Sequence, residues 1–440
     1  MELPEYVRPL IARLEDAGHP AYAVGGCVRD ALLGLTPHDY DLCTAATPEQ
    51  TKAIFRDYPM FLAGEKHGTV SIVAECHVVE ITTFRTESGY ADHRHPDRVE
   101  FVPRIEADLA RRDFTVNAMA YSPKRGFADP FGGREDLARK ILRAVGDPQK
   151  RFREDSLRIL RGVRFAVRYG LTPEPETENA MKELAPLMDN LARERVFDEL
   201  CKLLPLVTAD DLSRFSPVLA AAIPELGPLI GFDQHSPHHA YDLYTHVAHV
   251  VEGVPGDPAL RWAALLHDVG KIPTFTRDAT GRGHFYGHAK AGAELADGIL
   301  RRLKSPTALR EQVVTLIANH MTRLEPNKKT LRRQIGRLGW DTAEKLLVLQ
   351  EADMSSKGTG IPEDMEQFSR LRELFAEIRA EKDCLSLKDL AVNGNDLIAL
   401  GYSGKAIGTC LSYLLEQVLD ERLPNTREAL LNAAQIQSEG

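Results

Sequence analysis

The sequence predicts an α+β protein, with a small head that contains a mixed sheet with helices and a long all-α body behind it. Residues 70–84 alternate between polar and apolar side chains and are rich in β-branched residues, which predicts one or two strands. From about residue 105 onward, apolar residues recur at helical spacing almost to residue 435. A sheet restricted to the first part of the chain, with helices beyond it, gives this fold class.

Three shorter elements flank the predicted strands. Residues 1–20 carry apolar side chains at helical spacing and meet Gly18 near their end, which predicts an amphipathic helix. The segment Ala-Tyr-Ala-Val at residues 21–24 predicts a short strand that leads into two glycines. The polar segment between Arg85 and Arg98 predicts a loop.

Composition disfavours several classes of protein. The 440 residues are 43% hydrophobic and 27% charged, as in ordinary globular proteins. Six cysteines without a C-x-x-C pair disfavour a zinc knot and a disulfide framework, so we expect a reducing, cytoplasmic compartment. Because no apolar run reaches about 18 residues and the N-terminus lacks a secretory signal, we expect no membrane association. A net charge of −9 disfavours a wholly basic surface but allows a local basic groove.

A glycine pair and two aspartates follow the first predicted strand. The pair ending at Gly26 would let backbone N–H groups approach a phosphate near Arg29, although such a pair is often only a turn. Asp39 and Asp41 flank Tyr40, so on a strand both carboxylates would point to the same side. Mg²⁺ is the natural ion between two such carboxylates, and a solvated turn is the alternative.

Three further segments would complete a site in the head. Glu80 alternates within its strand and would offer a third carboxylate from a neighbouring strand. Arg111 and Arg112, with Asp113 beside them, suit contacts to a phosphate and a ribose. The turn-rich segment D-P-F-G-G at 129–133 would shape the floor of the pocket.

The order and spacing of G-G-C-V-R-D, D-Y-D, R-R-D-F-T-V-N-A and D-P-F-G-G resemble the bacterial class II tRNA nucleotidyltransferases. This family contains the CCA-adding enzymes and the related bacterial poly(A) polymerases, within the DNA polymerase β superfamily. The resemblance implies a polymerase-β-like nucleotidyltransferase head over residues 1–140. In that head the catalytic, Mg²⁺-binding residues would be Asp39 and Asp41, and the nucleotide would be bound by Gly26, Arg29, Arg112 and Asp113.

The following segment, 141–210, predicts a helical neck rich in arginine. Asp155, Arg158, Arg161 and Arg164 are three residues apart, so on a helix they form one slowly drifting stripe, which is either an exposed binding face or solvated charge. An aspartate–arginine pair can match the amino group and acceptor that cytosine and adenine share. The family's E-D-x-x-R pattern implies that Asp155 and Arg158 select C and A, while Arg161 and Arg164 help to hold the nucleotide.

The middle segment, 211–370, contains most of the histidines, several of them near the ends of predicted helices. Imidazoles and carboxylates in this order suit Mg²⁺, Mn²⁺, Ni²⁺ or Fe²⁺. The pattern resembles an HD-superfamily phosphohydrolase domain, whereas His284 lies outside that pattern. The resemblance implies metal ligation by His246, His267, Asp268 and Asp353, with His288 and His320 serving a second ion or the phosphate.

The last segment, 371–440, resembles the helical tail of the same family, which implies that it clamps the top half of tRNA; a helical packing domain is the alternative. Lys405 within G-Y-S-G-K-A-I-G would meet a phosphate. The R-E-R-V motif at 193–196 resembles a family motif that implies structural support.

These expectations combine into one function. The chain would add and repair the 3′-terminal CCA of tRNA from CTP and ATP, releasing pyrophosphate, with tRNA, ATP and CTP as partners and Mg²⁺ as cofactor. A second divalent transition metal in the HD domain would support phosphatase or 2′,3′-cyclic phosphodiesterase activity. The alternatives are a bacterial poly(A) polymerase, an HD phosphohydrolase with an inactive head, and a non-catalytic RNA-binding scaffold. The long Arg85–Arg98 segment favours addition of A as well as C.

Overall fold

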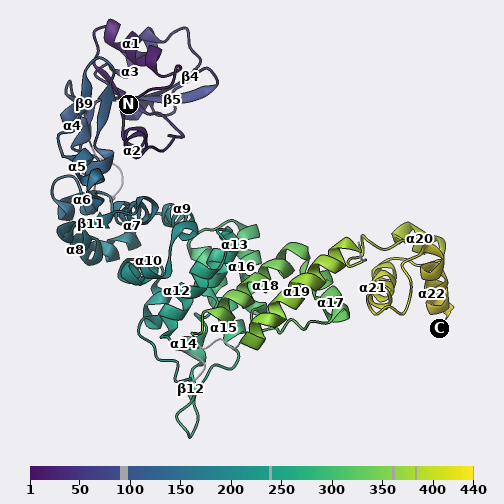
Figure 1. The fold of residues 1–440 in the computed structure, drawn as a ribbon. Helices are drawn as coiled ribbons and strands as arrows, with labels where there is room; N and C mark the ends of the chain where they lie inside the picture. The colour runs from purple at the N-terminus through teal and green to yellow at the C-terminus, as the bar shows by residue number, and fades with distance from the viewer. Residues whose placement is uncertain (90–97, 237–239, 359–361, 382–383, 440) are drawn as a thin grey trace. The chain divides into compact units, whose positions relative to one another are not determined.

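The computed structural model divides into two compact units (Figure 1). The α+β fold class is confirmed. Within the described residues, no helix is both long and apolar enough to cross a membrane. The first unit is Met1–Leu206 with Arg214–Gly227, and the second is Val207–Ser213 with Pro228–Gly440. The structure describes residues 1–89, 98–236, 240–358, 362–381 and 384–439.

A seven-stranded mixed sheet forms the centre of the head, in the order β3-β4-β5-β2-β1-β8-β9. All its neighbouring strands are antiparallel except β2 and β5, which run parallel. The predicted strands at 70–84 are confirmed as an antiparallel pair whose first member alternates between half-buried and buried residues. The bounds are β1 (Ala21–Val24), β2 (Leu42–Thr44), β3 (Met60–Phe61), β4 (Thr69–Ala74), β5 (His77–Thr83), β8 (Ala120–Ser122) and β9 (Gly126–Ala128).

The predicted loop between Arg85 and Arg98 is partly wrong. Its ends form an antiparallel pair, β6 (Arg85–Ser88) with β7 (Arg98–Phe101), because each end can complete the other's backbone hydrogen bonds. The intervening part of the loop, 90–97, lies outside the described residues. The predicted N-terminal helix is shorter than 1–20. The head helices are α1 (Arg8–Asp16), α2 (Gly26–Leu32), α3 (Pro48–Ile54), α4 (Ile105–Leu109) and α5 (Gly133–Ala138).

The neck belongs to the same compact unit as the head. Its central helix, α7, buries an apolar stripe that includes Ile159, Leu160 and Val163, and it packs against α9. A short parallel strand pair, β10 (Ile141–Leu142) with β11 (Thr172–Pro173), interrupts the predicted all-α neck. The helices are α6 (Pro148–Glu154), α7 (Leu157–Tyr169), α8 (Pro175–Leu184), α9 (Arg193–Leu203) and α11 (Ser216–Ala222).

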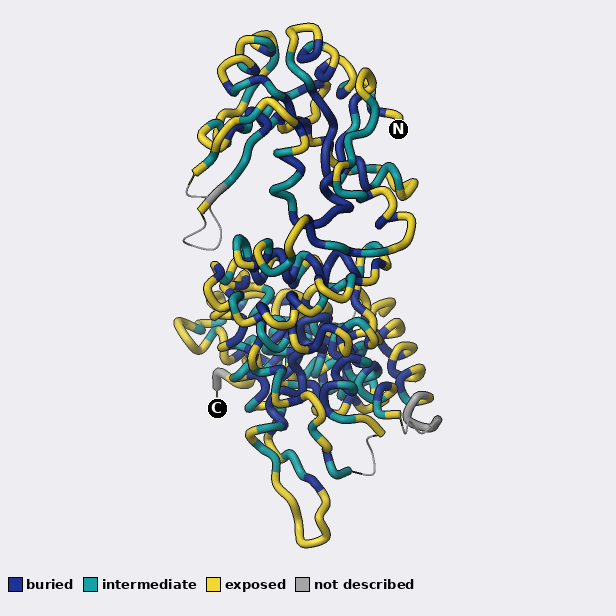
Figure 2. Tube along the Cα trace, turned by 90° about the vertical axis from the view of Figure 1, so that its left-hand side faces the viewer, coloured by how far each residue is buried: buried dark blue, intermediate teal, exposed yellow. Residues whose placement is uncertain are grey.

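Among its described residues, the second unit is helical apart from one exposed hairpin, which Figure 2 shows as a mostly exposed loop of chain. Helix α13 begins where Asp257 accepts a hydrogen bond from Leu260 N and Pro258 fixes the first turn. The elements are α10 (Ala209–Arg214), α12 (Leu243–Gly253), α13 (Pro258–Leu266), α14 (Lys271–Thr274), β12 (Thr276–Arg277), β13 (Gly283–His284), α15 (His288–Arg302), α16 (Thr307–Asn319), α17 (Lys328–Leu338), α18 (Trp340–Ser355) and α19 (Pro362–Ala380).

The tail lies in this second unit and has a small apolar core of its own. Leu397, Cys410, Leu414, Leu430 and Ala434 are buried together in it. Its helices are α20 (Gly394–Ala399), α21 (Lys405–Leu419) and α22 (Arg427–Glu439). The predicted four-domain division at 1–140, 141–210, 211–370 and 371–440 stays a prediction.

Candidate functional site

The turn after β1 brings an arginine close to the backbone. Gly25 has a φ of 76°, and a Cβ there would lie 2.6 Å from Nη1 of Arg112. The same guanidinium reaches the backbone oxygen of Asn117 at 3.5 Å. Gly25 therefore allows a cation to lie over the start of α2, next to Gly26, which a side chain at this position would prevent.

The two predicted catalytic aspartates lie at the start of β2. Val24 N donates to the backbone oxygen of Asp41 at 3.0 Å, which ties this residue to β1. Tyr40 is buried whereas Asp39 and Asp41 on either side of it are exposed. The strand begins only at Leu42, after all three residues, so the expectation that both carboxylates point to one side of a strand stays a prediction. Both carboxylates are accessible to a ligand at the N-terminal end of β2.

A third carboxylate lies beside them. The parallel register of β2 and β5 pairs Leu42 with Ile81, which brings Glu80 next to Asp41. Desolvation by the surrounding protein, the charge of Glu80 and the charge of Asp39 raise the pKa of Asp41, even though its carboxylate reaches solvent, and Arg112 opposes them. Such mutual repulsion is relieved by a divalent cation, so the residues present fit Mg²⁺.

Arg29 has a different environment from the one that the sequence predicts. It is buried, and its guanidinium donates to Asp30 at 2.7 Å, to Asn117 and to the hydroxyl of Tyr169. It also lies 4.2 Å from the ring centroid of Tyr169. These contacts link the head to α7, and a triphosphate could reach Arg29 only by displacing some of them. Its predicted role at the triphosphate stays a prediction.

Asp113 anchors one arginine of the neck. Its Oδ2 accepts from Nε and Nη2 of Arg161 at 2.9 and 2.7 Å, while its Oδ1 accepts from Asn117. Burial alone would raise the pKa of Asp113, but the charge of Arg161 and these hydrogen bonds lower it below its ordinary value. Asp113 therefore stays ionised and holds Arg161 in place.

An open cavity of about 320 Å³ joins these segments of the head and neck. Asp155 accepts from Nη2 of Arg195 at 3.1 Å, and Arg158 donates to Glu154 at 3.0 Å and to the backbone oxygen of Arg111 at 3.2 Å. Five guanidinium groups against two carboxylates make this cavity suited to a polyanion that carries a base. Its lining residues are Arg111, Arg112, Asp113, Asp155, Leu157, Arg158, Arg161 and Arg195.

The expectation of an exposed arginine stripe on α7 is wrong for two of its members. Arg158 and Arg164 are buried, because the neck packs around α7 and supplies each with a carboxylate. Arg164 donates through Nε to Glu199 at 2.6 Å and is absent from the cavity lining. Its predicted contact with the nucleotide stays a prediction.

Two arginines of the cavity have carboxylate partners that the sequence did not predict. Arg111, expected together with Arg112 to suit contacts to a phosphate and a ribose, also pairs with Asp108 and Glu87 at 3.0 Å. Arg195 was expected to give structural support, but it contacts Asp155 and lines the cavity. The sequence signals were the R-R and R-E-R-V motifs, and only the packing of α9 against α7 turns the second into part of this site.

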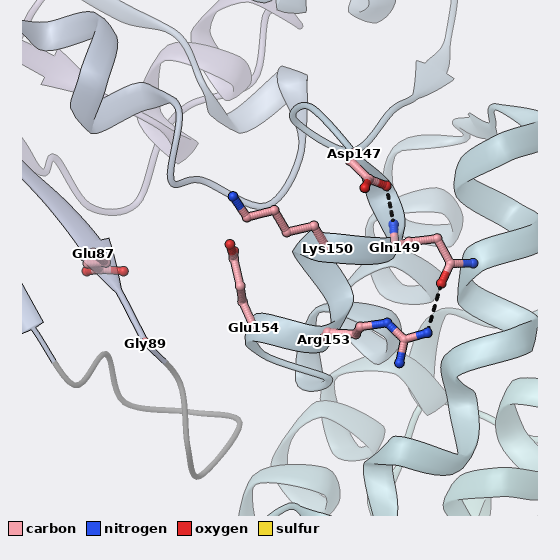
Figure 3. A pocket seen from close by; sticks show the side chains of 7 residues that line it. All are labelled: Glu87, Gly89, Asp147, Gln149, Lys150, Arg153 and Glu154. Carbon is pink, nitrogen blue, oxygen red and sulfur yellow. Dashed lines mark hydrogen bonds between the residues drawn. The ribbon is translucent and has the colours of Figure 1, made fainter.

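A second cavity, of about 530 Å³, lies beside α6 (Figure 3). Lys150 and Glu154 extend from α6 toward the side on which Glu87 lies. Arg153 donates to the side-chain oxygen of Gln149. The backbone N–H of Gln149 donates to the carboxylate of Asp147, which caps the start of α6. Because Glu154 also binds Arg158 of the first cavity, the two cavities share this helix end.

Four histidines of the second unit form one centre with Asp268. Each directs Nδ1 to a backbone oxygen, at 2.7 to 3.2 Å, which assigns the proton to Nδ1 and the lone pair to Nε2. This is the arrangement by which proteins orient metal-binding imidazoles. The four histidines and their acceptors are His246 with Ser356, His267 with Ala264, His288 with Phe285, and His320 with Ile317.

Two aspartates complete this centre. Asp268 lies 3.2 Å from Nε2 of His267 and 3.6 Å from Nε2 of His246, which in turn lies 3.1 Å from Asp353. Nε2 of His288 lies 3.2 Å from Nε2 of His320. Within the described residues, two groups could each hold an ion and share Asp268: His246, His267 and Asp268, and Asp268, His288 and His320.

The protonation states of His320 and Asp268 also fit a metal. Burial lowers the pKa of His320 to about 4, which keeps its imidazole neutral. Burial alone would raise the pKa of Asp268, but the charges of His267 and Lys271 lower it well below its ordinary value. Neutral imidazoles and ionised carboxylates are the forms that bind a divalent cation.

Close packing of α15 brings His288 to this centre. A Cβ at Gly270 would lie 2.2 Å from the backbone oxygen of His288, so only glycine allows α15 to approach here. Lys271 was not predicted; its Nζ lies 2.7 Å from Asp268 and donates to Gln234 at 2.9 Å. The sequence signal was its position three residues after Asp268. His284 pairs with Asp278 and takes no part in the centre.

Three family models match separate parts of the chain. Residues 21–143 match the poly A polymerase head domain, and residues 170–206 match the "Probable RNA and SrmB-binding site of polymerase A". Residues 285–434 match the second domain of tRNA nucleotidyltransferases. The matches cover most of the head, the later part of the neck and the larger part of the second unit, whereas residues 144–169, which include α6 and α7, lie outside all three.

Relatives match over nearly the whole chain. The CCA-adding enzyme of Latilactobacillus sakei is 32% identical over 98% of this chain and 98% of its own length. That of Limosilactobacillus fermentum is 34% identical over 98% and 96%. This chain belongs to the CCA-adding enzyme family. It is therefore a nucleotidyltransferase, and the predicted family is confirmed.

Solved structures of CCA-adding enzymes share the fold. The Bacillus stearothermophilus CCA-adding enzyme in complex with CTP superposes with a TM-score of 0.71 at 28% identity, covering 100% of this chain and 98% of that one. The Thermotoga maritima CCA-adding enzyme complexed with tRNA gives a TM-score of 0.61 at 21% identity, covering 100% and 97%. At that identity the second likeness concerns the fold alone.

Proposed function

We propose that this chain adds and repairs the 3′-terminal CCA of tRNA, using CTP and ATP and releasing pyrophosphate. One observation carries the proposal. The same compact unit contains exposed carboxylates suited to a divalent cation and a cavity lined by five arginines, in a chain that matches CCA-adding enzymes over 98% of its length. The poly(A) polymerase alternative shares these features and differs in which nucleotides are added.

The residues of the head divide the work of nucleotidyl transfer. A divalent cation, which we take to be Mg²⁺, held by Asp39 and Asp41 would lower the pKa of the tRNA 3′-hydroxyl and balance charge on the α-phosphate. Arg112, lying over Gly25, neutralises the triphosphate. Asp113 holds Arg161 so that this guanidinium lines the cavity that receives the nucleotide.

The neck supplies the choice of base. Asp155 can accept a hydrogen bond from the exocyclic amino group of cytosine or adenine, and Arg158 can donate to a ring nitrogen or carbonyl. Arg195 fixes Asp155 at 3.1 Å, and Glu154 fixes Arg158 at 3.0 Å. Guanine and uracil reverse this donor and acceptor pattern, so they would leave Asp155 facing an acceptor.

Single-turnover extension of a tRNA that lacks its last three nucleotides tests this function. CTP and ATP together should add three residues and then stop. Continued addition of A from ATP alone would instead favour a poly(A) polymerase. Binding of tRNA without incorporation, in wild-type protein, would favour the RNA-binding scaffold. An Asp39→Asn variant that keeps all measured activities would favour an HD phosphohydrolase with an inactive head.

We also propose a second activity, hydrolysis of phosphate esters by the HD centre. The observation that favours it is the alignment of four imidazoles by backbone oxygens around Asp268. A divalent transition metal bound there would supply an activated water for attack on phosphorus. Lys271, 2.7 Å from Asp268, keeps that carboxylate ionised and oriented.

Hydrolysis of RNA ends that carry a 2′,3′-cyclic phosphate, in the presence of Mg²⁺, Mn²⁺, Ni²⁺ or Fe²⁺, tests the second activity. The wild-type protein should bind metal, measured by elemental analysis, and cleave the ester, whereas Asp268→Asn should do neither. Extension of tRNA by Asp268→Asn serves as the control, because Asp268 belongs to the other compact unit. Absence of cleavage by wild-type protein with every metal would contradict the proposal.

The tail and the cellular location complete the proposal. The helical tail over 371–440, in which Lys405 starts α21, would hold the top half of tRNA. Its own small apolar core supports a rigid binding surface. The six cysteines form no disulfide with one another in the described structure and four of them are buried, which accords with a reducing compartment that we propose to be the cytoplasm.

A further inference from the structure

Three aromatic side chains pack together beside the acidic residues of the head. The ring of Tyr6 lies parallel to the ring of His77, with 4.1 Å between the centroids and 6° between the planes. It also meets the ring of Tyr40 edge-on, at 6.2 Å and 90°. Because Tyr40 separates Asp39 from Asp41, this aromatic cluster joins the N-terminal segment of the chain to the segment that carries both aspartates.

The aromatic cluster also reaches the strand that carries the third carboxylate. His77 is the first residue of β5, and Glu80 follows three positions later. Successive side chains of a strand point to opposite faces, so His77 shares a face with the buried Val79 and Ile81, and Glu80 lies on the other face. The cluster therefore contacts both segments that carry acidic residues, from the face of β5 opposite to Glu80.

The backbone orients the imidazole of the cluster. Glu75 and Cys76 form the two-residue turn between β4 and β5, and their φ angles of 47° and 67° are those of a tight hairpin that follows the twist of its strands. Nδ1 of His77 donates to the backbone oxygen of Glu75 at 2.9 Å. This hydrogen bond fixes the plane on which the ring of Tyr6 stacks.

The turn that carries Tyr6 is fixed as well. The backbone oxygen of Pro4 accepts from the backbone N–H groups of Val7 and Arg8, at 3.1 and 3.2 Å. Leu3 and Val7, on either side of Tyr6, are buried in the head. Both partners of the stack are therefore held by their own segments, and the stack joins those segments across the head.

The segment with the two aspartates, residues 39–41, needs such support. It precedes β2, and a backbone hydrogen bond of 3.0 Å ties Asp41 to β1. Desolvation and then the charges of Glu80 and Asp39 raise the pKa of Asp41, so these carboxylates repel one another while no cation lies between them. Burial and then the charge of Asp39 raise the pKa of Tyr6, so its phenol stays neutral beside this segment and balances none of that charge.

We propose that Tyr6 is a positioning residue for the catalytic carboxylates. Its ring, stacked on His77 and edge-on to Tyr40, keeps residues 39–41 close to β5, so that the aspartates and Glu80 stay within reach of one divalent cation. Without the ring, the repulsion between the carboxylates would separate the two segments, and a cation would have to draw them together again. The proposal rests on the assignment of Asp39 and Asp41 to that cation.

The dependence of tRNA extension on Mg²⁺ tests this role. In single-turnover reactions with saturating CTP, Tyr6→Leu should raise the Mg²⁺ concentration for half-maximal rate by about tenfold, as expected for loss of two aromatic contacts. The rate at saturating Mg²⁺ should stay within about threefold of wild type, because the carboxylates themselves are unchanged. Tyr6→Phe, which keeps both ring contacts, should restore the wild-type Mg²⁺ requirement.

Binding of Mn²⁺, followed by electron paramagnetic resonance in the presence of CTP and without tRNA, gives a second readout that needs no turnover. Full-length protein with Asp268→Asn serves as the background, so that the HD centre does not contribute a second ion. In this background Tyr6→Leu should weaken Mn²⁺ binding by about tenfold. His77→Ala, which removes an exposed partner of the stack, should weaken it by about threefold.

The matched control is Tyr58→Leu, because Tyr58 is another half-buried tyrosine of the head and meets Phe55 edge-on at 5.7 Å. It should leave the Mg²⁺ requirement unchanged, and thermal melts of each variant check that it folds. A folded Tyr6→Leu protein with the wild-type Mg²⁺ requirement would overturn the proposal, as would Tyr6→Phe as impaired as Tyr6→Leu. If Asp41→Asn keeps the wild-type Mg²⁺ requirement, the assignment of the carboxylates to the cation fails, and the role of Tyr6 fails with it.

Discussion

The two candidate centres of this protein hold their charged groups in opposite ways. In the first unit, Asp39 and Asp41 are exposed, and the neighbouring cavity is formed by guanidinium–carboxylate pairs such as Arg161 with Asp113. In the second unit, the imidazoles and Asp268 are buried, and backbone oxygens fix each ring. The first arrangement leaves charged groups accessible to a large ligand. The second fixes the positions of the ligating groups before a small ligand binds.

This difference follows from what each centre must hold. A nucleotide triphosphate and an RNA end bring several charges and leave again, so an open cavity of arginines suits them. A metal ion requires deprotonated ligands in fixed positions, and burial gives His320 a neutral imidazole. We therefore expect substitutions in the head to change rate and base choice, and substitutions in the HD centre to change metal content.

The largest expected effect comes from the exposed aspartates. Asp41→Asn should slow single-turnover tRNA extension by about a thousandfold or more, because loss of a metal ligand removes several kcal/mol of transition-state stabilisation. Metal bound by the HD centre should stay unchanged. Extension within tenfold of wild type would contradict the assignment of Asp41 as catalytic.

A smaller effect is expected at the base-selecting pair. Asp155→Ala should lower kcat/KM for CTP and ATP by about ten- to a hundredfold, as for loss of one or two charged hydrogen bonds, and should raise the relative use of UTP and GTP. Competition between the four nucleotides measures this change. Arg168→Ala, which changes an exposed arginine of α7 that does not line the cavity, is the control. Unchanged base choice in Asp155→Ala would assign selection to other residues.

The HD centre should respond to pH through His267. Burial alone would lower the pKa of His267, but the charge of Asp268 raises it above its ordinary value of 6.5. Protons therefore compete with metal near neutral pH, and affinity for a divalent cation should rise by up to about tenfold per pH unit between pH 6 and 8. Calorimetric titration of the EDTA-treated protein measures this slope. A flat profile would exclude His267 as a ligand.

The smallest expected effect concerns Glu154, which holds Arg158 of the base-selecting pair. Glu154→Gln should weaken the hold on Arg158, since Glu154 accepts from it at 3.0 Å, and should change the preference for CTP and ATP by about threefold. The same nucleotide competition measures it. An effect as large as that of Asp155→Ala would mean that Glu154 itself meets the nucleotide.

The sequence by itself determined which residues could carry chemistry. The alternation in β4 and β5, the order of the glycine and aspartate motifs and the set of histidines are local features, and local patterns fix strands, turns and the faces of helices. Family membership also follows from these motifs. This is why the α+β class and a third carboxylate near Asp41 are predictable from the order of residues.

Only the tertiary structure decided which groups the arginines contact and how far the histidines of the HD centre are buried. Arg164 turns inward to Glu199 and Arg195 turns to Asp155, because segments distant in sequence pack together there. An arginine in a sequence carries the same charge whether it meets solvent, a carboxylate or a nucleotide. Which of these it meets depends on long-range packing, and no local pattern contains that information.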